Sequence, residues 1–131
     1  MKIAVSALGS TLDSSVDARF GRCAYFLIVD VEGKEIKGFE AIQNTAANAI
    51  RGAGVQAAQT VLSKGAEVVL TGNIGPNAFA LLQGNGVKIV TGIVGISVKE
   101  AVERYLRGEL SEASGPTTLG FGRGPGMGFG R

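Results

Sequence analysis

Residues 68–92, VVLTGNIGPNAFALLQGNGVKIVTG, contain a strand, a helix and a second strand in one continuous run. The apolar residues of 68–72 and 86–92 are typical of buried strands, and Pro76 stands where the first turn of a helix tolerates a missing donor. We therefore expect a helix over 76–83. Two buried strands joined by a helix predict parallel pairing, with the helix packed on one face of the sheet.

The rest of the chain extends this unit. Residues 2–7 predict another buried strand, and residues 24–31 and 35–43 predict a β-hairpin whose second strand alternates apolar and polar side chains. The spacing of apolar residues predicts helices over 52–65 and 97–108, each ended by a glycine. The expected order is a strand, a hairpin, and then helix, strand, helix, strand and helix.

These elements predict an α/β fold with a mixed five-stranded sheet and about three helices. The first strand and the two later strands are apolar throughout, as strands covered on both faces are, whereas the hairpin is half polar. We therefore expect a sheet with a parallel centre and an antiparallel edge. A chain of 131 residues, 45% hydrophobic and 18% charged, fits one compact domain.

The composition also restricts the setting of the protein. One cysteine allows no internal disulfide, and we expect no secretory signal because the apolar start of the chain is short. No run approaches the roughly 18 apolar residues that a membrane helix requires. We therefore expect a cytoplasmic protein that makes no membrane contact.

The net positive charge of the chain comes from its C-terminal end. Residues 1–114 hold 11 Lys or Arg and 11 Asp or Glu, so the net charge of +2 comes from Arg123 and Arg131. Residues 115–131, GPTTLGFGRGPGMGFGR, hold 7 of the 21 glycines and no acid. We predict a domain over 1–114 and a disordered Gly/Arg-rich tail over 115–131. Two arginines release few counterions, so we expect little nucleic-acid binding, while self-association through the tail stays open.

The single cysteine, Cys23, lies where a charged turn meets an apolar strand in VDARFGRCAYFLIVD, residues 16–30. It is either a small buried hydrophobe or a thiolate whose pKa is lowered by the neighbouring Arg19 and Arg22. A metal site needs about four N, S or O ligands, and the chain has no histidine and no second cysteine. Any metal must therefore arrive largely with its own ligands or bind between two copies.

Catalysis is not expected from these residues. Without histidine the chain lacks the usual pair of nucleophile and base, and the loop acids show no clustering beyond Asp13 with Asp17. Two such acids either solvate a loop or pair with Arg19. The carboxylate cluster that a nuclease needs on its central strands is missing.

Two glycine-rich segments precede expected helices. GAGVQA, residues 52–57, partly matches a dinucleotide-binding motif, but no strand directly precedes it and no acid follows at the required distance. A helix start packed closely against the sheet is the simpler interpretation. TGNIGPNA, residues 71–78, follows a buried strand, where an open α/β sheet presents N–H groups to a ligand, although a tight connection alone also explains its glycines.

Three segments together carry a resemblance to a known family: VDARFGRCAYFLIVD, GAGVQAAQTVLSKGAEVVLTGNIGPNAFALLQGNGVKIV and YLRGEL. Over about residues 1–112 the chain resembles the dinitrogenase iron-molybdenum cofactor biosynthesis family. The resemblance implies a ribonuclease H-like three-layer fold. It also implies non-enzymatic binding, carriage or storage of an iron-sulfur or iron-molybdenum type metallocofactor, with metallocofactor donor or acceptor proteins as partners. The chain lacks the loop histidines of members that carry nitrogenase cofactor.

The resemblance further implies a cofactor-facing region. The residues that match it are Arg19, Phe20, Gly21, Arg22, Cys23, Asn44, Gly52, Gly54, Gly72, Asn73, Gly75 and Asn77. Among them, Cys23 is the candidate direct metal ligand. An anionic cluster that carries its own ligands needs positive charge and N–H donors, which arginines and glycine loops supply. The alternative function is a protein or nucleic-acid interaction module that acts through the tail.

Overall fold

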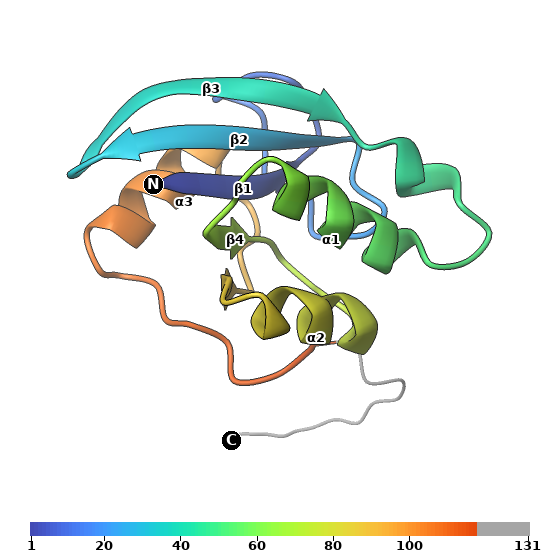
Figure 1. Cartoon of the computed structure of the whole chain (residues 1–131). Helices are drawn as coiled ribbons and strands as arrows, with labels where there is room; N and C mark the ends of the chain where they lie inside the picture. The colour runs from blue at the N-terminus through green and yellow to red at the C-terminus, as the bar shows by residue number, and fades with distance from the viewer. Residues whose placement is uncertain (118–131) are drawn as a thin grey trace.

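The computed structural model describes residues 1–117 and shows a five-stranded sheet with helices packed on it (Figure 1). The strands are β1 (Lys2–Ala7), β2 (Tyr25–Glu32), β3 (Glu35–Gln43), β4 (Val68–Leu70) and β5 (Lys88–Val90), and the helices are η1 (Thr45–Asn48), α1 (Ala53–Ser63), α2 (Pro76–Gly84) and α3 (Val98–Leu106). The predicted strands and α-helices are confirmed, and only the short 3-10 helix η1 was not predicted. Residues 118–131 of the predicted tail lie outside the described residues.

The strands lie in the order β3-β2-β1-β4-β5, so the N-terminal strand is the central one. β1 pairs in parallel with β4 and antiparallel with β2, and β4 pairs in parallel with β5. The predicted mixed sheet is confirmed, and the predicted parallel centre holds on one side of the central strand β1 only. The hairpin joins β1 directly through β2, so antiparallel pairing reaches the central strand and the parallel strands occupy one half of the sheet.

The two later parallel strands are shorter than the sequence indicated. β4 and β5 hold three residues each, whereas apolar runs of five and seven residues predicted them. Hydrogen bonds from Thr71 N to Val90 O (3.0 Å) and from Gly92 N to Gly72 O (2.8 Å) continue the contact beyond the strand ends. The apolar residues past these ends therefore line connecting loops instead of extending the sheet.

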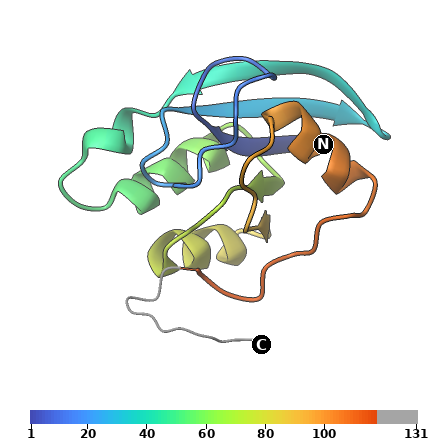
Figure 2. The ribbon, with the colours of Figure 1, turned by 180° about the vertical axis from the view of Figure 1, so that it is seen from behind.

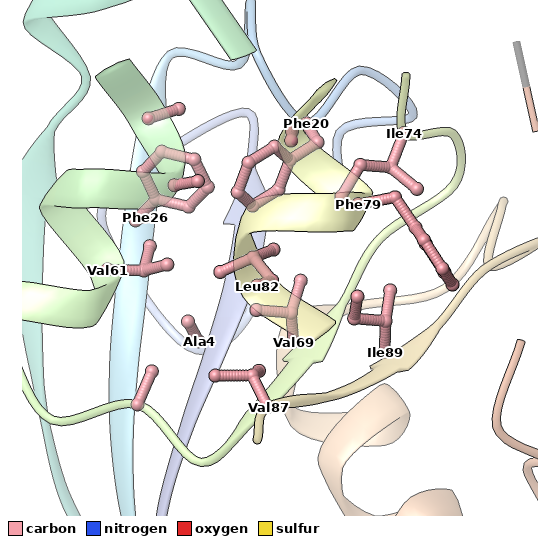
Figure 3. Close-up of a cluster of buried hydrophobic side chains, with 14 of the residues drawn as sticks. Ala4, Phe20, Phe26, Val61, Val69, Ile74, Phe79, Leu82, Val87 and Ile89 are labelled. Carbon is pink, nitrogen blue, oxygen red and sulfur yellow. The ribbon is translucent and has the colours of Figure 1, made fainter. Parts of the chain in front are cut away.

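Alternate side chains of the strands form two apolar cores, one on each face of the sheet. On one face, Ala4 of β1 and Val69 of β4 pack with Val61 of α1 and Leu82 of α2 (Figure 3). The core on the other face lies under α3 and includes Val5, Leu27, Leu70, Val98 and Val102. Full burial of a large aliphatic side chain contributes about 1.5–3 kcal/mol, so these two cores hold the helices on the sheet.

The helices α1 and α2 lie side by side on one face and begin at the same end of the sheet (Figure 1). This arrangement follows from the topology, because α1 leads into the start of β4 and α2 leads away from its end. Both helix N-termini therefore lie at the carboxyl ends of β1 and β4. No helix within residues 1–117 is long and apolar enough to cross a membrane.

After α3 the chain returns along the sheet to the start of α2 (Figure 2). Ala113 N donates to Ile89 O of the edge strand β5 (2.7 Å), and Thr117 N donates to Ile74 O (2.9 Å). These hydrogen bonds lie on both sides of the predicted boundary at 114. Glycine and proline weaken regular helices and strands, but they do not prevent single anchoring hydrogen bonds.

The core under α1 and α2 predicts a matched pair of mutations. Leu82 is fully buried in α2, so Leu82→Ala is expected to lower the free energy of unfolding by about 2–5 kcal/mol. Leu81 is only partly buried against the same core, and Leu81→Ala should cost clearly less. Urea denaturation followed by circular dichroism measures both. Equal losses for the two variants would contradict the assignment of Leu82 to the core.

Candidate anion-binding site

A cavity of about 380 Å³ lies at the end of the sheet where α1 and α2 begin. Three segments of the chain form it: residues 19–22, residues 52–55 and residues 73–78. The first segment follows β1 through a loop, the second opens α1, and the third connects β4 to α2. Among all these lining residues there are two arginines and no acid.

The N-termini of α1 and α2 both contribute to the cavity wall. Neither Gly52, the N-cap of α1, nor Gly75, the N-cap of α2, supplies a side-chain cap, and neither helix has an acid in its first turn. The first N–H groups of a helix have no partner within the helix and carry partial positive charge. Two such helix starts therefore give the cavity hydrogen-bond donors and a positive potential.

Small residues allow the three segments to meet. A Cβ atom on Gly21 would lie 3.0 Å from the Cα and N atoms of Gly54, and a Cβ atom on Gly54 would lie 3.3 Å from Cβ of Ala78. Close contact between the loop of residues 19–22 (the arginine loop), α1 and α2 therefore depends on the small residues Gly21, Gly54 and Ala78. Gly52 has φ 70°, a left-handed conformation that glycine adopts without strain. Gly54 serves close packing, as the sequence indicated for this helix start, but it packs against the loop at Gly21 and against α2 instead of the sheet.

Arg19 is held at the cavity by the buried carboxylate of Asp17. Oδ1 of Asp17 accepts from the backbone N (3.0 Å) and Nε (3.2 Å) of Arg19, and Oδ2 accepts from Nη2 (3.3 Å). Asp17 is 3% exposed, whereas the Arg19 side chain is 64% exposed. The hydrogen bond and the charge of Asp17 raise the pKa of Arg19, so the guanidinium stays charged. Of the two roles open to Asp17, pairing with Arg19 is the one observed.

The backbone beside Arg19 is fixed to the loop before α2. Asn73 N donates to Ala18 O (2.6 Å), and Phe20 N donates to Asn73 O (3.1 Å), which forms a short parallel bridge. A Cβ atom on Gly72 would lie 2.7 Å from Cα of Ala18, so only glycine permits this crossing. Gly72 therefore acts behind the cavity, where it sets the distance between two of its walls.

Arg22 lines the cavity and also braces the segment that leads to α1. Its Nη1 atom donates to Ala47 O (2.8 Å) and Ala49 O (2.6 Å). A guanidinium has five N–H donors, and these two bonds use the donors of one nitrogen. Within residues 1–117 the Nε and Nη2 groups of Arg22 make no other hydrogen bond, so they can donate to a ligand.

Cys23 and Asn44 lie behind the cavity instead of lining it. Cys23 is fully buried in the core, Sγ donates to Phe20 O (3.3 Å), and burial raises the pKa of the thiol to about 12. Asn44 Nδ2 donates to Gly21 O (3.1 Å) and Cys23 O (2.9 Å), and these hydrogen bonds stabilise the conformation of residues 21–23. This geometry favours the interpretation of Cys23 as a buried hydrophobe over that of a thiolate ligand. Residues 1–117 contain no group of three His, Cys, Asp or Glu that could hold a metal ion.

The cavity brings together most of the residues expected from sequence. Those that line it are Arg19, Phe20, Gly21, Arg22, Gly52, Gly54, Asn73, Gly75 and Asn77, and those that do not are Cys23, Asn44 and Gly72. The lining residues not named from sequence are Ala53, Val55, Ile74, Pro76 and Ala78. They are the direct sequence neighbours of the named glycines and of Asn77, so including every residue of each loop would have found them.

The fold and the cavity define a small α/β domain with a positively charged site at the carboxyl ends of its parallel strands. The sequence profile of the family described as "Dinitrogenase iron-molybdenum cofactor" matches residues 1–108, and the chain belongs to this family. An uncharacterized protein of Methanocaldococcus jannaschii is 30% identical over 113 residues, covering 86% of this chain and 95% of that protein.

Two solved structures are similar over nearly their whole length. The apo form of the orange protein from Desulfovibrio gigas has a TM-score of 0.84 and 42% identity, covering 88% of this chain and 95% of that one. A putative NifB protein from Thermotoga has a TM-score of 0.73 and 35% identity, covering 93% of this chain and 97% of that one. The similarity therefore concerns the complete domain of each relative.

The buried thiol predicts a pH-dependent contribution to stability. Burial raises the pKa of Cys23 from 9.0 to about 12, so the unfolded chain ionises before the folded protein does. The stabilisation from Cys23 is then complete below about pH 8.5 and is lost as the pH rises from there toward the folded-state value. We expect the difference in unfolding free energy between wild type and Cys23→Ala to be constant from pH 7 to 8 and smaller at pH 10, by urea denaturation.

A labelling experiment checks the same assignment independently. At pH 8 an aromatic disulfide reagent should modify Cys23 only after urea unfolds the chain. Rapid modification of the folded protein would mean that the thiol reaches solvent and would contradict a core position.

Proposed function

We propose that this protein is a non-enzymatic binder of an anionic iron-sulfur or iron-molybdenum type metallocofactor and that the cavity described above receives it. One observation carries the proposal: two uncapped helix N-termini and two arginines surround one cavity whose lining contains no acid. Each of these groups stabilises negative charge, and none of them binds a bare metal cation. The family to which the chain belongs supports a metal-containing guest.

The donors of the cavity fit a guest that brings its own ligands. Arg19 and Arg22 offer charged N–H groups, and Asn73 and Asn77 add polar residues from the segment that leads into α2. A metal ion without ligands needs thiolate, imidazole or carboxylate groups, and the one thiol, that of Cys23, is buried and protonated. A sulfide-ligated metal cluster presents acceptor atoms to such donors and needs no bond from the protein to the metal.

Carriage or storage follows more naturally from this chemistry than catalysis does. The cavity lining supplies charge and hydrogen bonds but contains no side chain suited to act as a nucleophile or a general base. A guest held in this way would be exchanged with metallocofactor donor or acceptor proteins in the cytoplasm. We further propose that the fold is ribonuclease H-like, which the strand order 3-2-1-4-5 and the reversed direction of β2 support.

The proposal predicts the effect of removing the two arginines. Anaerobic reconstitution with iron and sulfide should give charge-transfer absorbance and bound iron in the wild type. In Arg19→Ala/Arg22→Ala the iron retained after gel filtration should fall at least about tenfold, since each charge-assisted hydrogen bond contributes about 1.5–3 kcal/mol. The doubly conservative Arg19→Lys/Arg22→Lys should retain an intermediate amount, because lysine keeps the charge but loses the planar fork.

The control is Arg104→Ala/Arg107→Ala, which removes the same charge from α3 and the residue after it, on the other face of the sheet. It should bind iron as the wild type does. Equal losses in both double variants would mean that only net charge matters, and a wild type that retains no iron would refute the proposal.

A further inference from the structure

The buried polar side chains of residues 1–117 all support one loop, residues 17–23. They are Ser6, Asp17, Asn44 and Thr71, each at most 5% exposed. The first three make hydrogen bonds directly to atoms of this loop, and Thr71 reaches it through Ser6. Burying a polar group costs free energy that burying an apolar side chain does not. Their concentration behind the two cavity arginines therefore points to a role in the site.

Ser6 and Thr71 interrupt an apolar row of the sheet. Ala4 of β1 and Val69 of β4 are register partners on the face that α1 and α2 cover (Figure 3). Side chains two residues further along a strand lie on the same face, and these positions are Ser6 and Thr71. Both are fully buried, and their hydroxyl oxygens lie 2.7 Å apart. The core thus changes from methyl groups to hydroxyls at the end of the sheet where the cavity lies.

The hydroxyl hydrogens of this pair are directed toward residues 17–23. Ser6 Oγ donates to Asp17 O (2.7 Å), which uses the single hydrogen of the serine hydroxyl. The Thr71 hydroxyl must therefore donate to Ser6 Oγ. Asp17 N also donates to Ser6 O (2.8 Å). The backbone of Asp17 is thus fixed at both its N–H and its C=O group.

Asp17 in turn fixes Arg19. Its carboxylate accepts from N, Nε and Nη2 of Arg19, although the Arg19 side chain is 64% exposed. Ordering a long exposed side chain during binding costs conformational entropy, and a guanidinium that is already held avoids most of this cost. The negative charge of Asp17 repels an anion at the same time. Orientation and charge therefore act on anion affinity in opposite directions.

We propose that Thr71, Ser6 and Asp17 are positioning residues that orient Arg19 toward the guest, and that Asp17 thereby strengthens anion binding despite its own charge. This inference rests on the proposed function, because it concerns the same cavity. It adds three residues that do not line that cavity. The hydrogen bonds that orient Arg19 all lie within the protein, so the orientation can be measured without a guest.

The sign of one substitution separates orientation from charge. Asp17→Asn removes the negative charge and keeps an oxygen that accepts from Arg19 N, but an NH₂ group replaces the oxygen that accepts from Nη2. With tetrathiomolybdate as the anionic probe, we expect Asp17→Asn to weaken binding about two- to tenfold, the cost of ordering one long side chain. A purely electrostatic role would tighten binding instead. Equilibrium dialysis measures the probe, and iron retained after reconstitution with sulfide gives the same comparison for a cluster.

The same substitution in an Arg19→Ala background tests whether Asp17 acts through Arg19. Without the guanidinium only the charge of Asp17 remains, so Asp17→Asn should then tighten binding of the probe. A residue that merely supports the fold would weaken binding in both backgrounds. The reversal of sign between the two backgrounds is therefore the signature of a positioning residue.

The hydroxyl pair is tested without a change of charge. Ser6→Ala leaves Asp17 O and the Thr71 hydroxyl without a partner, and it should weaken probe binding at least about twofold. Thr71→Val should act in the same direction, whereas Thr71→Ser keeps the hydroxyl and should bind as the wild type does. The matched control is Ser63→Ala, which removes an exposed hydroxyl from α1 and should leave binding unchanged.

Nitrogen-15 spectra of the protein without the probe report on Arg19 directly. Its Nε–H group donates to Asp17 Oδ1 (3.2 Å), so its hydrogen should exchange with solvent more slowly than that of Arg51, an exposed arginine. Exchange at Arg19 should become faster in Asp17→Asn and in Ser6→Ala, while Ser63→Ala should not change it.

The outcomes distinguish this inference from the proposed function. A wild type that binds the probe or retains iron, together with an Asp17→Asn variant that binds equally or more tightly, would overturn the inference alone. Weaker binding of Asp17→Asn in both backgrounds, or unchanged exchange at Arg19 Nε–H, would also overturn it and leave the cavity as the site. A wild type that binds neither tetrathiomolybdate nor iron and sulfide would overturn both.

Discussion

The crossing of two loops at the carboxyl ends of β1 and β4 organises the functional end of the molecule. Asn73 N donates to Ala18 O (2.6 Å) and Phe20 N donates to Asn73 O (3.1 Å), and Gly72 makes the approach possible because a Cβ atom there would lie 2.7 Å from Cα of Ala18. These two hydrogen bonds form an isolated parallel bridge between Arg19 and Asn73, outside the β1–β4 pairing. They place the arginine loop beside the start of α2, and the cavity is the space left between them.

A domain with no net charge can still have a strongly positive site, because the local potential depends on where the charged groups lie. Several surface acids have lysine or arginine partners elsewhere, as in the pairs Lys64–Glu40 and Arg107–Glu109. Within the described part of the chain, Asp17 is the only acid that pairs with an arginine of the cavity lining. This pair leaves most of the Arg19 side chain exposed. Adding two helix N-termini to two arginines concentrates positive potential in one place without raising the net charge of the domain.

The buried position of Cys23 separates this site from one that holds metal through thiolates. A cluster bound by cysteine leaves only after metal–sulfur bonds are exchanged, whereas a guest held by charge and N–H donors can leave whole. Reversible release suits the carriage or storage that we propose.

Local sequence patterns were sufficient to predict the α-helices, the approximate positions of the strands, the mixed sheet and most of the cavity lining, since apolar periodicity and glycine turns act over a few residues. Long-range packing decided the rest: that β1 is central with β2 beside it, that Cys23 faces the core, and that residues 107–117 return to Ile74. A short sequence pattern does not specify which distant segment will cover a side chain. Burial and pKa are therefore set only when β-sheet and helices pack together.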